Sequence, residues 1–261
     1  TEYRTVTGVL AESSNIGTVL VSETLTPKRL EEYFRKFGLG TKTGTGFPGE
    51  SAGLLTKSED WSGTQRATVA FGQGLSVTAI QAAGVFQTIA NNGVRVEPRL
   101  IESTTDKDGT VKQTPASKGS RVVDEKVAKQ VSEMLEGVVS PNGTAPQAQI
   151  AGYRVAGKTG TADRYDPTVG GYSGKTASFI GYAPADDPQI VVAVILQRPT
   201  NGYFGGSTAG PVFHDVMTYA LQELKIPPTG TAAPQLVLDL EPSAAEADPT
   251  TLRNKPKGSG G

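Results

Sequence analysis

Ile190-Val191-Val192-Ala193-Val194-Ile195-Leu196 is the longest apolar run in the 261-residue sequence. The run has the length of a β-strand and falls well short of the roughly 18 apolar residues that a membrane span needs. Because no polar residue alternates with the apolar ones, it predicts a central strand that is covered on both faces.

The segments on either side of this run predict the rest of a sheet. Ala177 to Ala183 predicts a strand that a turn around residues 184–188 joins to the apolar run, and Arg154 to Ala162 predicts a shorter, mixed one. A last helix is expected from about Ala209, and Ile226-Pro227-Pro228 ends it. Helices, then strands, then a final helix predict an α/β (α+β) fold, with an antiparallel sheet flanked by helices.

Capping signals predict where several of the earlier helices begin. Thr26-Pro27 places Thr as the N-cap and Pro at the first helical position. Thr78 and Gln81 have the spacing of a capping box, and Asp124 is expected to cap a further helix. Residues 106–109, Asp-Lys-Asp-Gly, predict the turn of a β-hairpin.

Charge and composition exclude several classes of function. With 25 basic and 26 acidic residues, the chain has no electrostatic reason to bind nucleic acid. The absence of cysteine excludes disulfide scaffolds, thiolate metal sites and a cysteine nucleophile. The single histidine, His214, excludes a histidine-rich metal site, and its place in an apolar stripe beside Phe213 favours a structural role. Neither a metal nor a cofactor is therefore expected.

The motif K-T-G-T occurs twice, and the surrounding residues distinguish the two copies. Lys158-Thr159-Gly160-Thr161 lies in a predicted strand, where glycines indicate a close approach to the backbone. A cation with two neighbouring hydroxyls there suits an anionic ligand. Lys42-Thr43-Gly44-Thr45 lies among turn residues and predicts a loop. The alternative for the first copy is a surface strand in which the motif occurs by chance.

Polar residues in two loops are further candidates. Ser13 and Asn15 lie two residues apart between helical stretches, so that both polar ends could point to one side. The alternative is that Ser13-Ser14-Asn15 only caps helices. Tyr165, Asp166 and Tyr172 follow the K-T-G strand, where they either border a site or form a simple connection.

Several stretches occur in an order that resembles a known family. They are Glu12 to Gly17, Phe37 to Gly40, Gly46 to Glu50, Phe71 to Gly74 with Val77-Thr78, Ala90 to Gly93, Val155 to Ala162, Phe179 to Pro184, and Gly205-Gly206 through Pro211-Val212-Phe213 to Ile226-Pro227-Pro228. In this order they resemble the penicilloyl serine transferases, and most closely the class B penicillin-binding proteins of the septal, cell-division type that cross-link peptidoglycan. The resemblance extends over nearly all of residues 1–228.

The family resembled here has three active-site motifs, S-x-x-K, S-x-N and K-[ST]-G. The second is matched by Ser13 and Asn15, and the third by Lys158, Thr159 and Gly160. The first has no match, because no lysine of the chain has a serine three residues before it. The nucleophile is therefore expected upstream of Thr1. Residues 1–228 are expected to be a transpeptidase domain that lacks its N-terminal segment and is inactive alone.

The resemblance also implies roles for these residues in serine acyl transfer. The absent serine attacks the D-Ala-D-Ala carbonyl of a stem peptide, Ser13 relays a proton to the leaving amine, and Asn15 orients the substrate amide. Lys158 supplies positive potential for the terminal carboxylate, which the hydroxyls of Thr159 and Thr161 bind. The Thr161 N–H forms half of the oxyanion hole.

The same resemblance implies partners and a location. The expected partners are peptidoglycan stem peptides, β-lactam antibiotics and divisome membrane proteins, with no nucleic acid. The expected location is the extracytoplasmic face of the bacterial cell membrane, with an N-terminal anchor outside this chain. Residues 229–261 are rich in Pro, Ala, Thr and acidic residues, and they predict a disordered tail.

Three alternatives remain open at the level of sequence. A serine β-lactamase shares the last two motifs, although the 143-residue separation of Asn15 and Lys158 (158 − 15) and the Ile-Pro-Pro ending resemble the transpeptidase. A β-lactam sensor without catalytic activity is the second alternative. The third is a fragment that folds only as part of a larger domain.

Overall fold

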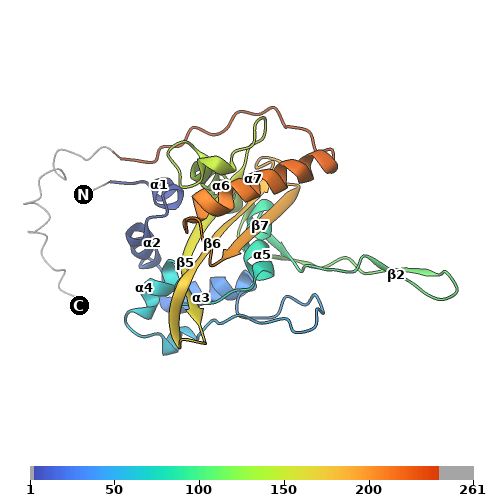
Figure 1. Ribbon diagram of the computed structural model, residues 1–261, viewed down its shortest axis with the longest axis horizontal. Helices are drawn as coiled ribbons and strands as arrows, with labels where there is room; N and C mark the ends of the chain where they lie inside the picture. The colour runs from blue at the N-terminus through green and yellow to red at the C-terminus, as the bar shows by residue number, and fades with distance from the viewer. Residues whose placement is uncertain (1–2, 241–261) are drawn as a thin grey trace, which may run out of the picture.

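The computed structural model describes residues 3–240, and at its centre lies a three-stranded antiparallel sheet (Figure 1). The strands are β5 (Ala156–Asp166), β6 (Gly171–Ala183) and β7 (Ile190–Gln197), in the order β5-β6-β7. The predicted antiparallel sheet is confirmed, but β5 and β6 are longer than predicted. Their joined ends form a ribbon in which polar residues alternate between exposed and half-buried positions. The apolar residues in the sequence therefore predicted only the part of each strand that other elements cover.

The strand β7 is covered on both faces, as predicted, but it is not central in the described part of the chain. There it pairs only with β6, through a register that aligns Val194 with Phe179. Its apolar character is explained by the helices packed on its two faces. An unbroken apolar run reports cover by neighbouring elements, and it does not report strand order.

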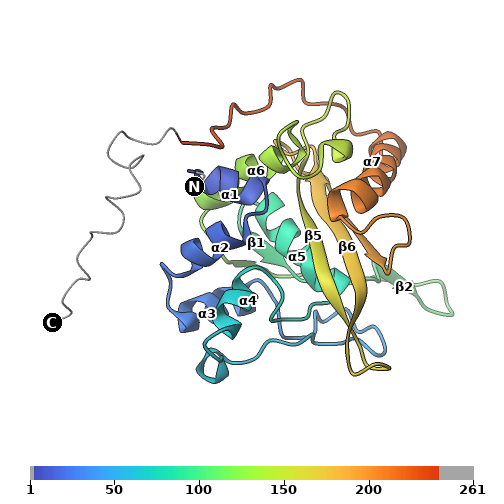
Figure 2. The ribbon, with the colours of Figure 1, turned by 60° about the vertical axis from the view of Figure 1, so that its left-hand side comes forward.

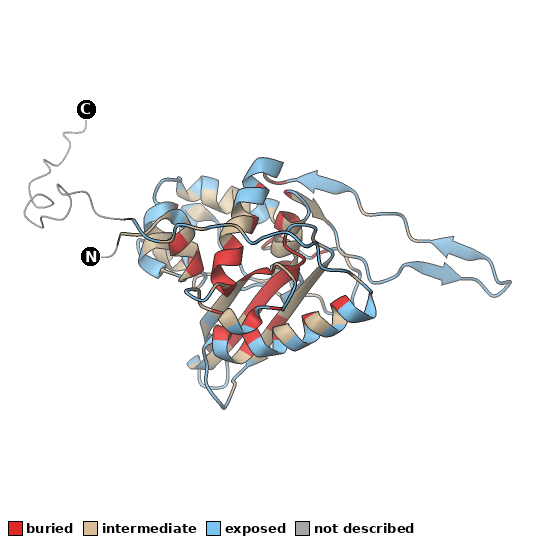
Figure 3. Cartoon of the chain, turned by 90° about the horizontal axis from the view of Figure 1, so that it is seen from above, coloured by how far each residue is buried: buried red, intermediate tan, exposed pale blue. Residues whose placement is uncertain are grey.

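Two helical layers enclose the sheet (Figures 1 and 3). On one face, α7 (Gly205–Glu223) buries Phe213 against Phe179, with ring centroids 4.6 Å apart. On the other face, α5 (Ala79–Ala90) and α6 (Glu125–Glu136) pack around the buried ring of Tyr182. This second cluster also contains Val191 of β7, one residue out of phase with those that face α7.

The predicted helix starts are confirmed, with one difference at the last helix. Thr26 caps α3 (Pro27–Lys36), and Thr78 with Gln81 forms the capping box of α5. The last helix, α7, begins at Gly205 instead of Ala209. Its first residue packs directly on the sheet, because a Cβ on Gly205 would lie 2.3 Å from the Ser178 carbonyl oxygen. Because glycine has a low helix propensity, the sequence did not predict that the first turn begins at this glycine.

The remaining elements lie around this core. Two short sheets pair β1 with β4 and β2 with β3, and the second is the predicted hairpin, which projects from the body (Figure 1). Their bounds, with those of the other short elements, are β1 (Val94–Val96), β2 (Ser103–Thr105), β3 (Val111–Gln113), β4 (Gly119–Arg121), α1 (Val6–Ala11), α2 (Asn15–Ser22), α4 (Gln65–Ala70) and the 3₁₀ turns η1 (Ser58–Asp60), η2 (Gly137–Val139) and η3 (Pro146–Ala148).

Residues 231–240, named the C-terminal strap below, run back over the body to the N-terminal segment (Figure 2). Pro234, Leu236 and Leu238 are half-buried, while Gln235 and Val237 between them are exposed. Leu240 N–H donates to the Tyr3 carbonyl at 2.8 Å. The prediction of a disordered tail from residue 229 is therefore wrong for the strap, and residues 241–261 lie outside the described part. The apolar run Leu236-Val237-Leu238, which is untypical of a disordered tail, was the signal that could have found it.

No helix among residues 3–240 is both long and apolar enough to cross a membrane.

Candidate active site

Lys158 projects from β5 toward the turn that joins α1 and α2. Its Nζ donates to Ser13 Oγ at 2.7 Å, and it also lies 3.2 Å from the Thr159 carbonyl oxygen and 3.3 Å from Thr159 Oγ1. Two of the predicted residues, 145 positions apart in sequence, therefore meet in one hydrogen-bonded group.

The glycines beside Lys158 allow a close approach, but the approaching groups belong to the protein itself. A Cβ on Gly157 would lie 2.5 Å from the Phe179 ring, and one on Gly160 would lie 2.5 Å from Ser178 Oγ. The glycine pattern thus reports tight packing of β5 on β6, and it is not by itself evidence of a ligand.

Ser13 is held by the capping structure at the end of α1. Its N–H donates to the Leu10 carbonyl at 3.3 Å, and the Ser14 N–H donates to the Val9 carbonyl at 3.0 Å. These two bonds form a Schellman motif, with Ser13 in its left-handed position at φ 59°. A non-glycine residue in this conformation is strained. The turn directs the Ser13 hydroxyl to Lys158.

The neighbouring serine takes the capping role that the sequence left open. Ser14 is the N-cap of α2, and its Oγ accepts from the Gly17 N–H at 3.1 Å. Asn15 is the first residue of α2 and is exposed. Within the described residues, no hydrogen bond joins its side chain to Ser13 or Lys158. The structure therefore brings Ser13 to Lys158 but does not bring Asn15 into contact with either.

A row of hydroxyl groups continues along β5 from Lys158. Thr159 Oγ1 lies 2.8 Å from Thr144 Oγ1, and Thr161 Oγ1 accepts from the Gly205 N–H at 3.0 Å. Gly205 begins α7, so the positive end of a 19-residue helix lies beside Thr161. Sequence reasoning missed Thr144, which carries no motif of its own, and it gave Gly205-Gly206 only as part of the family resemblance, without a place at this site. The Gly205-Gly206 pair ahead of an apolar helix was the only local signal.

Burial lowers the pKa of Lys158 from 10.5 to about 8. The atoms around Nζ are hydroxyl and carbonyl oxygens and not carboxylates, so no opposite charge compensates for the lost hydration. A lysine in this state is still mostly protonated at pH 7, and it releases its proton far more readily than a lysine in water. The site therefore combines a positive charge, the hydroxyl groups of Ser13, Thr144, Thr159 and Thr161, and a helix N-terminus. This combination suits an anionic group beside a proton-transfer step.

The second K-T-G copy serves the fold. Lys42 is exposed in a loop, as predicted, while Thr43 is buried. The Thr43 N–H donates to Glu50 Oε1 at 2.7 Å, and the Thr43 hydroxyl donates to the same oxygen. These bonds lower the pKa of the Glu50 carboxyl.

The other candidate residues lie apart from Lys158. His214 is half-buried on α7, and its Nδ1–H donates to the Gln149 carbonyl at 2.6 Å, which agrees with a structural role. Tyr165 and Tyr172 form an edge-to-face pair near the end of the β5–β6 ribbon. Asp166 is buried there against Arg198, and a hydrogen bond from Thr168 is the main cause of its lowered pKa.

Comparison with known proteins identifies the class of this site. The family model described as the penicillin-binding protein transpeptidase domain matches residues 1–218. The chain is 42% identical over 244 residues to penicillin-binding protein PbpB of Mycolicibacterium smegmatis, covering 90% of this chain and 38% of that protein. It is 37% identical over 227 residues to "Probable peptidoglycan D,D-transpeptidase PenA" of Neisseria flavescens, covering 86% and 54%.

A solved structure supports the same conclusion. Penicillin-binding protein 3 from Mycobacterium tuberculosis, in complex with ampicillin, is similar with a TM-score of 0.85 and 41% identity, over 91% of this chain and 55% of that one. The chain thus spans about half, or less, of the relatives it matches. It belongs to the penicillin-binding transpeptidase family, among the class B proteins.

Proposed function

We propose that the whole protein containing this chain is a peptidoglycan D,D-transpeptidase that cross-links stem peptides and is acylated by β-lactams. The observation that carries the proposal is the 2.7 Å contact between Lys158 Nζ and Ser13 Oγ, beside the hydroxyls of Thr159 and Thr161. A relative named as a D,D-transpeptidase and a similar structure that holds ampicillin support it.

The reaction requires a nucleophile outside these 261 residues, since no S-x-x-K is present. We place that serine in a segment preceding Thr1. Its Oγ attacks the carbonyl of the penultimate D-Ala, its proton passes to its neighbouring lysine, and the terminal D-Ala leaves as an amine that takes up a proton. The amine of a second stem peptide then attacks the acyl-enzyme and restores the serine.

The residues described here bind the substrate and assist the departure of the terminal D-Ala. Ser13 lies between Lys158 and open solvent, which suits a relay that passes a proton to the departing amine. The charge on Lys158, with the hydroxyls of Thr159 and Thr161, binds the terminal carboxylate. Asn15 orients the substrate amide, and the Thr161 N–H contributes half of the oxyanion hole. Gly160 lets β5 pack closely on β6 beside these residues.

The proposal extends to a cellular setting. One relative, 38% identical over 224 residues, is "Stage V sporulation protein D" of Bacillus subtilis. We place this protein at the extracytoplasmic face of the cell membrane, anchored by a preceding segment, as a septal cell-division enzyme with divisome membrane proteins as partners. Membrane fractionation and co-purification of the whole protein test this placement.

The enzymatic proposal is tested on the whole protein with a donor stem peptide and an acceptor amine. Release of D-Ala together with a cross-linked product is the expected result. A penicilloyl-enzyme that persists for many turnover times separates a transpeptidase from a β-lactamase, which hydrolyses the adduct quickly. Rapid hydrolysis without any cross-linked product contradicts the proposal, and penicillin binding without D-Ala release indicates a sensor.

A further inference from the structure

The C-terminal strap holds the helix that presents Ser13. Thr5, the N-cap of α1, donates its N–H to the Leu238 carbonyl at 3.0 Å and its hydroxyl to the Val237 carbonyl at 2.6 Å. The same hydroxyl accepts from the Gly8 N–H at 3.0 Å, so one side chain joins the strap to the first turn of α1. Gly8 has no room for a side chain, because a Cβ there would lie 2.1 Å from the Leu238 carbonyl oxygen.

An ionic contact continues from the strap to the other end of α1. Arg4 pairs with Asp239 of the strap at 3.0 Å and also with Glu12, the C-cap of α1. Glu12 is followed directly by Ser13. The strap is therefore coupled to both ends of the helix whose terminal turn places the Ser13 hydroxyl against Lys158.

The helix α1 depends on such contacts because it has only six residues. A helix of this length does not persist in water by itself, since isolated helices shorter than about 12–15 residues are marginal. Ser13 is in addition held in a strained left-handed conformation. Such strain persists only where the surrounding structure maintains it. The geometry of the Ser13 turn is therefore set by what packs on α1.

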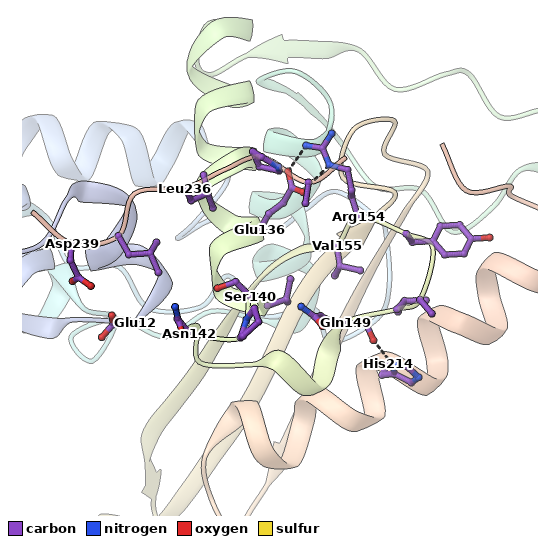
Figure 4. A pocket seen from close by; sticks show the side chains of 18 residues that line it. Glu12, Glu136, Ser140, Asn142, Gln149, Arg154, Val155, His214, Leu236 and Asp239 are labelled. Carbon is purple, nitrogen blue, oxygen red and sulfur yellow. Dashed lines mark hydrogen bonds and ion pairs between the residues drawn. The ribbon is translucent and has the colours of Figure 1, made fainter. Parts of the chain in front are cut away.

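The strap is attached mainly near its two ends. At its start, Thr231 accepts from Arg154 Nη1 at 3.2 Å and donates to Asp186. At its end, it pairs with the segment before α1. Between these points, Pro234 and Leu236 border a cavity of about 1110 Å³ that Glu12 and His214 also line (Figure 4). Residues 232–236 make no hydrogen bond to the described part of the protein, so this stretch is held only by its half-buried side chains and opens locally at a small free-energy cost.

We propose that the C-terminal strap is a positioning element of the transpeptidase site. Leu238 and Asp239 of the strap, and Arg4 of the segment that the strap contacts, are the positioning residues. When docked, the strap holds α1 so that Ser13 Oγ stays within hydrogen-bonding distance of Lys158. When released, α1 loses its N-terminal contacts and the Ser13 turn loosens. This inference rests on the proposed function, because it assigns the strap to the proton-relay step of that reaction.

The test compares Leu238→Ser with the matched control Val237→Ser in the whole protein. Leu238 faces the body and Val237, 67% exposed, faces solvent, so the two variants make the same kind of change on opposite sides of one strap. Leu238→Ser is expected to slow penicillin acylation about tenfold. Positioned proton transfer contributes roughly 100-fold or more to a rate, and the variant is expected to lose only a part of that contribution. Noncovalent affinity is expected to stay unchanged, because the described hydrogen bonds of Lys158, Thr159 and Thr161 do not involve the strap.

Faster hydrogen exchange at the Thr5 amide is expected in Leu238→Ser and not in the control, which shows strap release independently of activity. Equal acylation rates in the two variants, with normal acylation of the unaltered protein, contradict the strap inference alone. Absence of acylation in the unaltered protein contradicts the proposed function.

A second variant decides the matter if Leu238→Ser does not fold. Arg4 and Asp239 face each other across the antiparallel bridge and exchange no backbone hydrogen bonds, which is the pairing that suits a disulfide. The chain has no cysteine of its own. The double variant Arg4→Cys with Asp239→Cys is expected to acylate faster when oxidised than when reduced, while the unaltered protein responds to neither condition. Equal rates in the two redox states overturn the proposal.

Discussion

Lys158 and Lys42 begin the two K-T-G copies, and only Lys158 meets another site residue. In the whole protein, Lys158→Ala is expected to slow penicillin acylation by at least about 100-fold, because it removes the group that we propose binds the carboxylate and contacts the relay. Lys42→Ala is the matched control and is expected to have almost no effect. Rates of labelling by a fluorescent penicillin measure both effects. The reverse ranking would show that Lys42, and not Lys158, belongs to the site.

The charge on Lys158 also predicts a pH dependence. Burial lowers the pKa of Lys158 to about 8, so the amine is charged below this pH and neutral above it. Affinity for a noncovalent peptide ending in D-Ala-D-Ala is therefore expected to fall as the pH rises through about 8. Titration by calorimetry in the whole protein measures the change. In Lys158→Arg the charge persists above pH 8, and a loss of affinity over the same range in that variant would assign the effect to another group.

At the scale of elements, the contact of β5 with β6 depends on glycine. A Cβ on Gly157 would lie 2.5 Å from the fully buried ring of Phe179, which has no space to move. Gly157→Ala is expected to lower the free energy of unfolding by about 1–3 kcal/mol, as overpacking does elsewhere. Chemical denaturation of the whole protein measures it.

Gly171, on the paired strand β6, is the control for this substitution. No atom lies within 4 Å of a Cβ there, and its φ is not in the left-handed region. Gly171→Ala is expected to leave stability unchanged or to raise it by up to about 1 kcal/mol, by reducing the entropy of the unfolded chain. Equal destabilisation by the two substitutions would show that strand propensity, and not the Phe179 contact, requires glycine at 157.

At the scale of the whole molecule, the site is incomplete without a serine nucleophile. We expect this 261-residue chain to form no covalent adduct with a fluorescent penicillin at pH 7. Ser13 has no lysine three residues on, where Ile16 stands, although the structure supplies Lys158 from β5. With a pKa of about 8, that lysine is mostly protonated at pH 7 and donates to Ser13, so it does not activate the hydroxyl as a base.

Intact-mass spectrometry of the chain after incubation with penicillin measures the outcome. Ser13→Ala is the control, and it is expected to give the same unmodified mass. A stoichiometric adduct that maps to Ser13 would overturn both the missing nucleophile and the relay role given to this residue.

Local pattern determined much of this protein. Periodicity and capping act over a few positions, so they can be identified from neighbouring residues alone. Examples are the strand runs, the Thr78–Gln81 capping box and the residues around the two K-T-G copies. They sufficed to predict an antiparallel sheet flanked by helices, to assign Lys158 and not Lys42 to a strand, and to nominate Ser13. The family was inferred from a resemblance in the order of motifs along the chain.

Only the tertiary structure decided which of these groups meet. Ser13 reaches Lys158 across 145 positions, Thr144 reaches Thr159, and Asn15 contacts neither Ser13 nor Lys158. The strap is docked on α1, where composition had predicted disorder, and helices cover both faces of β7. Each of these depends on packing between segments that are distant in sequence. Local periodicity reports only that a face is covered, whereas the fold determines what covers it.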